Sequence, residues 1–167
     1  FELFDLETSF FIDDDQLKTS YRKEISRFHP DKYVTKSESE KIQALQNTSL
    51  LNTAFTSLKT PLNRASYLLK MEGIDPFDER DTAMNHDFLI SQIDLREELE
   101  VIEEDRDSFG LEGFLERVDL HIEKNTESIY KGFKLKSDLM DIKMNVRELK
   151  FYDQLYKEAN KLMDELL

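Results

Sequence analysis

Apolar residues recur at intervals of three and four along almost the whole chain, which is the spacing of amphipathic helices. No segment shows the strict alternation of apolar and polar residues that a half-buried strand would need. Only four Gly and three Pro interrupt the pattern in 167 residues. The sequence therefore predicts an all-α protein.

The first predicted helix begins at Asp13 and ends near His29. Asp13, with Gln16 three positions later, resembles a helix-capping arrangement. Pro30 has no amide hydrogen and disfavours helical geometry in the residue before it, so the helix should stop there. At 100° per residue, four apolar side chains fall within an arc of about 80° on one face of this helix: Leu17, Tyr21, Ile25 and Phe28.

A second helix should follow a loop over about residues 30–36. Ser37 and Glu40 match the capping box S-x-x-E, in which each side chain satisfies a free amide at the helix start. The short loop indicates that the first two helices pack antiparallel. The second helix carries Ile42, Leu45, Leu51, Phe55 and Leu58.

A short third helix completes a first domain that we place at residues 1–72. Thr60 and Pro61 form the cap-then-proline signature of a helix start, and Gly73 should close the helix at its C-cap. Residues 73–84, which are rich in charge, then form a predicted linker.

Three long helical patterns make up the rest of the chain, residues 85–167. They cover about residues 85–107, 112–135 and 137–166, with breaks near Gly110 and Lys136. Short connections between long helices predict an antiparallel three-helix bundle.

Composition and charge exclude several classes of function. The chain has 39% hydrophobic and 35% charged residues, which is typical of a folded protein with a strongly solvated surface. Its net charge of -13 opposes generic nucleic-acid binding, and no apolar run approaches the roughly 20 residues that span a membrane. Without Cys there is no thiolate for catalysis or metal binding, and we expect no metal or cofactor.

The most distinctive local feature is the tripeptide His29-Pro30-Asp31 at the end of the first helix. The preceding helix carries Tyr21-Arg22-Lys23 at its middle, and residues 17–32 contain five basic and two acidic side chains. The basic side chains are Lys18, Arg22, Lys23, Arg27 and Lys32. Such a local reversal of charge suits docking on an acidic protein surface. The alternative is that Pro30 only stops a helix and the basic residues form a solvated face.

This arrangement resembles a J-domain. The resemblance implies that His29, Pro30, Asp31 and the surrounding basic side chains bind a DnaK-type chaperone and promote hydrolysis of the ATP that the chaperone holds. The chain itself has no Gly-rich phosphate-binding loop, because its four Gly are scattered. We therefore expect an ATPase activator that is not itself an enzyme.

The helix predicted over residues 85–107 carries apolar side chains on two sides. Phe88, Leu95, Leu99 and Ile102 share one face, which should be the core face. Leu89, Ile90, Ile93 and Val101 fall on the opposite side, among acidic residues that include Asp94, Glu97, Glu100 and Glu104. An apolar patch rimmed by carboxylates is typical of a protein-binding surface, although these residues could instead pack on the second neighbour in the bundle.

Three segments extend the resemblance to the HscB family over essentially the entire chain: Leu95-Arg96-Glu97-Glu98-Leu99, Pro61-Leu62-Asn63-Arg64-Ala65 and Tyr67-Leu68-Leu69. HscB-like proteins join a J-domain to a three-helix bundle that presents the iron-sulfur scaffold IscU to the chaperone HscA. The residues that correspond to the family's client-binding positions are Leu89, Ile90, Ile93, Asp94, Glu97 and Phe151.

Isoleucine at positions 90 and 93 departs from the longer or straighter side chains frequent in the family. Phe151 shares a stripe with Met144 and Leu155, so burial in the bundle competes with client contact at that position.

The resemblance further implies a monomer in the bacterial cytoplasm, or in the mitochondrial matrix if the source is eukaryotic. Two other functions remain open from the sequence. One is a J-domain adaptor for a different protein client, and the other is a structural helical assembly protein.

Overall fold

The computed structural model describes residues 1–167, and its regular structure is entirely helical, as the sequence predicts. The chain divides between Met71 and Glu72 into an N-terminal unit, residues 1–71, and a C-terminal unit, residues 72–167. The six α-helices are α1 (Asp14–Arg27), α2 (Glu38–Lys59), α3 (Pro61–Met71), α4 (His86–Asp105), α5 (Ser108–Lys134) and α6 (Leu139–Leu166), with short 3-10 helices η1 (Glu2–Phe4) and η2 (Pro30–Lys32). None of these helices is both long enough and apolar enough to cross a lipid bilayer.

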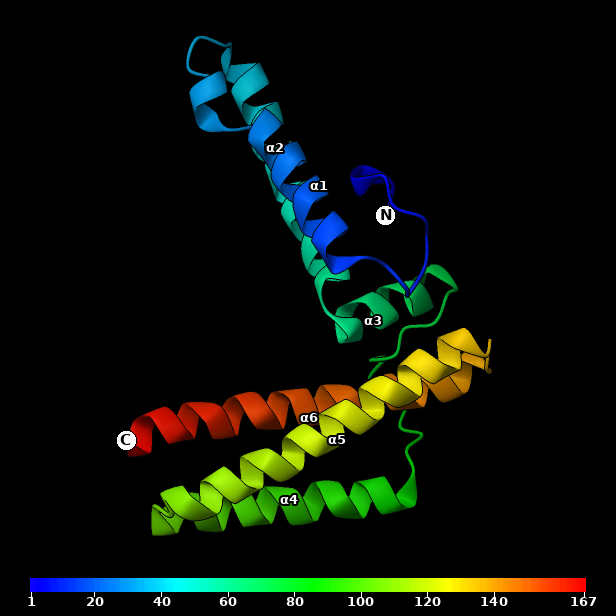
Figure 1. Ribbon diagram of the computed structural model, residues 1–167, viewed down its shortest axis with the longest axis vertical. Helices are drawn as coiled ribbons and strands as arrows, with labels where there is room; N and C mark the ends of the chain where they lie inside the picture. Colours follow the sequence, from blue (N-terminus) through cyan, green and yellow to red (C-terminus); the bar gives the residue numbers. More distant parts are fainter. The chain divides into compact units, whose positions relative to one another are not determined.

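In the N-terminal unit, α1 and α2 form an antiparallel hairpin, and α3 follows at the end remote from the loop (Figure 1). Its core contains Phe4, Leu17, Leu51 and Leu58. Tyr21 of α1 stacks on Phe55 of α2 with ring centroids 4.1 Å apart. The predicted antiparallel pair is therefore present and is joined by aromatic as well as aliphatic packing.

Local capping fixes the ends of these helices much as the sequence predicts. The Asp13 carboxylate accepts hydrogen bonds from the amides of Asp15 and Gln16, and Ser37 and Glu40 form the reciprocal capping box of α2. One boundary differs, because α1 ends at Arg27. Phe28 already has non-helical backbone angles, so the helix stops earlier than the proline alone would require.

Arg64 of α3 connects the three helices of the N-terminal unit. It is buried, donates a hydrogen bond from Nη1 to the carbonyl of Leu58 at 2.9 Å, and lies 3.6 Å from the Asp14 carboxylate. Its guanidinium also lies over the ring of Phe10. Burial lowers the pKa of Arg64, while the charge of Asp14 partly offsets that effect.

In the C-terminal unit, α5 and α6 run antiparallel along one another and α4 packs beside them (Figure 1). The buried core draws on all three helices: Phe88, Leu99, Ile102, Leu111, Phe114, Val118, Phe151, Tyr152, Leu155 and Ala159. Gly132 allows a close approach between α5 and α6, because a Cβ there would lie 2.8 Å from Cγ1 of Ile142.

The predicted break near Gly110 is wrong in position. Arg106 takes a left-handed conformation with φ 51°, and the Asp107 carboxylate then accepts a hydrogen bond from the amide of Gly110 at 2.9 Å. The cap therefore starts α5 at Ser108, four residues before the predicted start. Gly110 lies inside the first turn and interrupts nothing.

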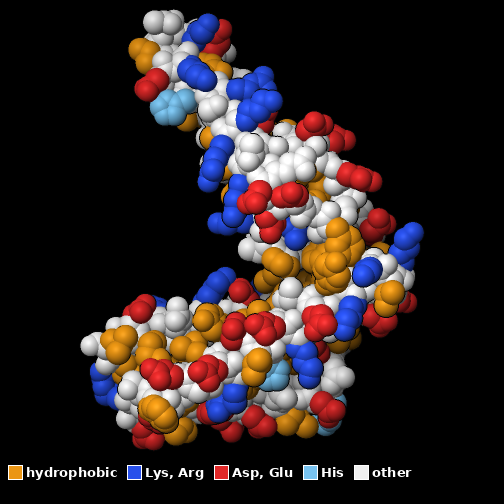
Figure 2. Space-filling model, in the orientation of Figure 1, with side chains coloured by type: hydrophobic (Ala, Val, Ile, Leu, Met, Phe, Trp, Pro, Cys, Tyr) orange, Lys and Arg blue, Asp and Glu red, His pale blue; other side chains and the backbone are white.

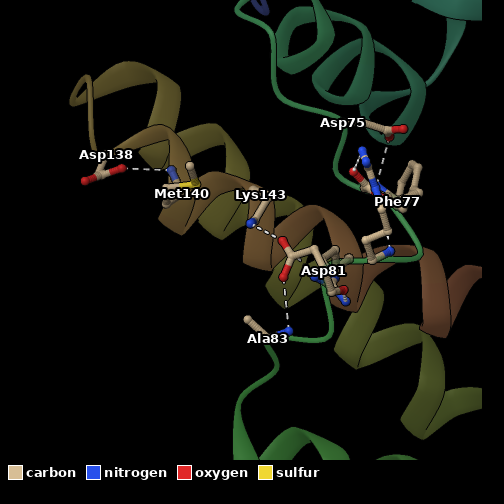
Figure 3. A network of polar contacts seen from close by, with 10 residues as sticks. Asp75, Phe77, Asp81, Ala83, Asp138, Met140 and Lys143 are labelled. Atoms are coloured by element: carbon tan, nitrogen blue, oxygen red, sulfur yellow. Dashed lines mark hydrogen bonds and ion pairs between the residues drawn. The ribbon is translucent and has the colours of Figure 1, made fainter.

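Residues 73–84 begin with Gly73 in a left-handed conformation, φ 78°, and then run along α6 within the C-terminal unit. The Asp81 carboxylate accepts hydrogen bonds from Lys143 of α6 and from the amide of Ala83 (Figure 3). The hydrogen bond from Lys143 is the main cause that lowers the pKa of Asp81. The segment predicted to be a linker is thus held on the bundle at this point.

Candidate functional site

The His-Pro-Asp turn, residues 29–31, begins a short 3-10 helix whose first residue is Pro30. His29 caps it, because its Nδ1 accepts a hydrogen bond from the Asp31 amide at 3.2 Å. The amides of Lys32 and Tyr33 donate to the carbonyls of His29 and Pro30 at 2.9 and 3.0 Å. Proline fixes one backbone angle and three hydrogen bonds close the turn, so its shape is set before any partner binds.

The Asp31 carboxylate points into solvent from this turn, with 88% of its side chain exposed. One carboxylate oxygen lies 3.5 Å from His29 Nδ1. When Nδ1 accepts the hydrogen bond from the Asp31 amide, it has no proton to donate to that oxygen. The carboxylate therefore keeps its lone pairs available for an external cation.

Basic side chains lie along α1 up to the turn. Lys18, Arg22, Lys23 and Lys32 are exposed. Arg27 is also exposed, but it pairs with Glu24 at 2.8 Å and leans over the ring of Phe28. Figure 2 shows Lys and Arg side chains gathered on this part of the N-terminal unit. All eight residues predicted to contact a chaperone thus lie at the surface of the α1 helix and its turn.

The sequence analysis missed an apolar groove next to the turn, which Val34 and Leu45 help to line. Leu45 was grouped with Leu51 and Leu58, yet it is exposed, whereas those two are buried. The signal was present in the sequence. At 100° per residue, Leu45 lies about 120° around the helix from Leu51.

The outer face of α4 carries the second candidate surface. Leu89, Ile90 and Ile93 are between 44% and 51% exposed, so the bundle does not enclose them. Phe88, Leu99 and Ile102 of the same helix are buried, as the two-sided pattern predicts. Asp94 and Glu97 are exposed, as are Glu100 and Glu104. The outer face of α4 thus carries exposed apolar side chains among exposed carboxylates.

Two ion pairs hold α4 against its neighbours while leaving that outer face free. Arg96 pairs with Glu158 of α6, and Arg117 of α5 pairs with Glu98. The two pairs attach α4 to both other helices of the bundle. The helix that carries the outer apolar side chains is therefore held in place from two sides.

Phe151 is buried, which is one of the two arrangements that its stripe on α6 left open. Only 7% of the residue is exposed, and its ring meets that of Phe88 edge-on with centroids 5.6 Å apart. The Arg96 guanidinium lies 5.5 Å from the centre of the same ring. Packing under α4 thus outweighs exposure at this position, and Phe151 supports the helix that carries Leu89.

Three titratable side chains of α5 and α6 lie close together: His121 is exposed, Glu148 is half-buried and Tyr152 is buried. His121 of α5 stacks on Tyr152 of α6 with centroids 4.6 Å apart and nearly parallel planes. Burial lowers the pKa of His121 and raises the pKa values of Glu148 and Tyr152. No group of three or more His, Asp or Glu side chains is placed to hold a metal ion.

Comparison with known proteins finds the same architecture. Residues 84–160 match the HSCB C-terminal oligomerisation domain. The chain is similar to the chaperone HscB from Vibrio cholerae, with 32% identity over 100% of this chain and 98% of that one, and a TM-score of 0.85. It is similar to the human co-chaperone protein HscB, with 25% identity over 96% of this chain and 80% of that one, and a TM-score of 0.86.

A likeness in fold extends to the Jac1 co-chaperone from Saccharomyces cerevisiae, with 23% identity over 92% of this chain and 88% of that one, and a TM-score of 0.68. The similarity to the Vibrio cholerae protein covers both units. The N-terminal unit is therefore a J-domain, and the C-terminal unit is the helical domain that follows it. The chain belongs to the HscB co-chaperone family.

Proposed function

We propose that this protein stimulates the ATPase of an HscA/DnaK-type chaperone and delivers to it the iron-sulfur scaffold IscU, as a step in iron-sulfur cluster assembly. The observation that carries the proposal is the solvent-exposed carboxylate of Asp31, held on a proline-braced turn at the end of a basic helix. In this role the protein works in the bacterial cytoplasm, or in the mitochondrial matrix of a eukaryote.

On the chaperone side, Asp31 pairs with an arginine of the ATPase, for which a carboxylate is the matching bidentate partner. Lys18, Arg22 and Lys23 steer the encounter toward an acidic patch and make its rate sensitive to salt. Pro30 limits the conformational entropy that the turn loses on docking. The protein contributes activation only, and ATP stays with the chaperone.

On the client side, the outer face of α4 supplies anchors and orientation. Leu89, Ile90 and Ile93 provide apolar area, while Asp94 and Glu97 select a client surface with neighbouring positive charge. The cluster is cargo of the scaffold, so this chain needs no metal ligands of its own. Phe151 acts from beneath by supporting α4.

The chaperone side is tested by steady-state ATPase measurements on the purified chaperone with increasing amounts of Asp31→Asn. We expect stimulation to fall at least about 10-fold, because a neutral amide cannot form the charge-assisted pair. The matched control is Asp15→Asn, which alters an exposed carboxylate in the first turn of α1, at the end remote from Asp31. Full stimulation by Asp31→Asn would rule out the proposed role of the turn.

The client side is tested by titrating IscU with the double variant Leu89→Ala and Ile93→Ala. Loss of two anchors should weaken binding by about 10- to 100-fold, and helicity should stay unchanged because both side chains point outward. The control Leu120→Ala removes an exposed leucine, 64% accessible, from α5. If the wild-type protein activates the chaperone but does not bind IscU, it serves a different client.

A further inference from the structure

The segment between α3 and α4, residues 72–85, is attached to α6 through Asp81. The Asp81 carboxylate accepts a hydrogen bond from Nζ of Lys143 and lies 3.4 Å from Nη1 of Arg147. Nη2 of Arg147 also donates a hydrogen bond to the main-chain carbonyl of Asp81 at 2.8 Å. Figure 3 shows Asp81 turned from this connecting segment toward Lys143. We call the three residues the Asp81 clamp.

The clamp differs from an ordinary surface ion pair in the burial of its cations. The side chain of Lys143 is 12% exposed and that of Arg147 is 14% exposed. Ion pairs between exposed side chains stabilise little, but a mostly buried cation that loses its partner keeps the cost of its desolvation. Separation of Asp81 from α6 would leave two such cations without their carboxylate, so the closed clamp is favoured.

A second attachment lies four residues before Asp81. Nζ of Lys150 is 3.9 Å from the centre of the Phe77 ring, which is a cation–π contact. Lys143, Arg147 and Lys150 follow one another at intervals of four and three, so they share one face of α6. This face holds the connecting segment at Phe77 and at Asp81. Only residues 72–76, five of the fourteen between α3 and α4, precede the first attachment.

The length of unattached chain decides how strongly two linked binding sites assist one another. The effective concentration of the second site falls roughly as the -3/2 power of the length of a flexible linker. A tether of five residues in place of fourteen therefore raises that concentration by about 5-fold. The attachments on α6 thus have a consequence for binding that goes beyond the stability of the bundle.

We propose that Asp81 is a positioning residue for client delivery. By clamping the connecting segment on α6, it shortens the tether between the J-domain and the outer face of α4, and so strengthens simultaneous binding of chaperone and client. This role rests on the proposed function and adds to it a residue that couples the two binding sites. Asp81 contacts neither partner and acts only through the chain that joins their sites.

The clamp is opened by the double variant Lys143→Met and Arg147→Met. Both substitutions lie on α6, so the sequence of the connecting segment is unchanged, and apolar replacements of similar length leave no buried charge behind. The matched control is the double variant Lys157→Met and Lys161→Met, which makes the same change in charge at two exposed positions of α6 with the same spacing. Circular dichroism checks that both variants keep their helices.

A first measurement needs no partner. The side chain of Arg80 is 90% exposed, so trypsin can cut after it once the surrounding segment opens. We expect the cut after Arg80, followed by mass spectrometry, to become at least about 5-fold faster in the clamp variant and to keep the wild-type rate in the control. An unchanged rate in the clamp variant would show that the clamp does not hold the segment.

The main measurement is chaperone ATPase against the concentration of co-chaperone, once alone and once with equimolar IscU. Equimolar IscU avoids an excess of free client, which would occupy the chaperone by itself. The ratio of the two half-maximal concentrations gives the coupling between the partners. We expect the clamp variant to lower this ratio by about 5-fold, with unchanged stimulation in the absence of IscU and unchanged affinity for IscU.

An insertion separates tether length from the chemistry of the clamp. About nine Gly and Ser residues placed after Gly73 restore a tether of fourteen residues while the clamp stays closed. This variant should lose about as much coupling as the clamp variant, yet the cut after Arg80 should keep its wild-type rate. Full coupling in the insertion variant would overturn the proposal, because the length of the tether would then not matter.

The remaining outcomes assign a failure to its cause. Weaker IscU binding by the clamp variant would mean that the clamp shapes the outer face of α4, and an equal loss of coupling in the control would mean that charge alone is responsible. Either result overturns the proposal while the proposed function stands. If Asp31→Asn stimulated the chaperone as well as the wild type, the proposed function itself would fail, whatever the rate of the cut after Arg80.

Discussion

Asp31 is available to a partner because of the two residues that precede it. Pro30 sets the backbone at the first position of the 3-10 helix, and the imidazole of His29 accepts the hydrogen bond that the Asp31 amide would otherwise offer to water. The side-chain carboxylate of Asp31 therefore stays available to accept hydrogen bonds from a partner. At the scale of single residues, the tripeptide acts as one unit in which two members orient the third.

The pKa of Glu148 is raised because the carboxyl group is partly buried in the bundle. A raised pKa in the folded state means that folding favours the protonated form, so the charged form reduces stability as pH rises above the ordinary glutamate value. We predict that Glu148→Gln raises the melting temperature at pH 7, and that its advantage over the wild type shrinks as pH falls toward the ordinary glutamate pKa of about 4.3 and is absent below it.

Thermal unfolding followed by circular dichroism at several pH values measures this effect, with Glu116→Gln as an exposed control on α5. A difference between Glu148→Gln and the wild type that grows toward acid pH would show that burial of the charge is not its cause.

The sequence predicted which side chains of α4 are exposed better than it predicted which side chains pack against each other. Helical phase placed Leu89, Ile90 and Ile93 opposite the core face, and their exposure decides against packing on the second neighbour in the bundle. Phe151 did not, because its stripe on α6 is compatible with both burial and exposure until the position of α4 is known. The contact between the rings of Phe151 and Phe88, which are 63 positions apart in sequence, settles the matter only in three dimensions.

Element boundaries were predictable where a capping side chain dominates. The Asp13 and Ser37 caps involve residues at most three positions away, so the sequence contains the whole interaction. The start of α5 was placed too late because Gly110 was given more weight than Asp107, whose carboxylate caps the helix. Glycine in a first helical turn has a small cost that a cap offsets.

The contact between α5 and α6 depends on the missing side chain of Gly132. We predict that Gly132→Ala destabilises the C-terminal unit by about 1 kcal/mol, because overpacking against Ile142 exceeds the gain in helix propensity. Gly113→Ala is the matched control on the same helix. No atom lies within 4 Å of its added Cβ, so it should stabilise by about 0.5 to 1 kcal/mol.

Urea unfolding of the two glycine variants measures both changes. Equal stabilisation by the two substitutions would mean that α5 and α6 do not approach as closely at Gly132 as described.

At the scale of the whole molecule, charge is unevenly distributed. The chain carries a net charge of -13, yet the segment that includes α1 and the turn is basic, and the outer face of α4 is acidic. In the proposed function, the basic surface attracts an acidic patch of the chaperone and the acidic surface attracts a basic client, so the two partners do not compete for one site. The sequence predicted this division because charge segregation by helix is visible without any structure.

The apolar groove beside the turn lay beyond that reasoning. It is formed by Phe28 and Pro30 from one segment and by Leu45 from α2, so it arises only when the hairpin closes. Periodicity assigns each of these residues to a face of its own helix, but it does not say which faces leave a space between them.

The central claim is that activation and client binding must reside on one chain. The most direct test mixes two complementary variants, Asp31→Asn and the double variant Leu89→Ala and Ile93→Ala, and measures chaperone ATPase in the presence of IscU. One variant holds the client without activating, and the other activates without holding the client. The account predicts that the mixture shows no more client-dependent stimulation than the sum of its parts, because the benefit depends on covalent linkage. Recovery of wild-type stimulation by the mixture would contradict it.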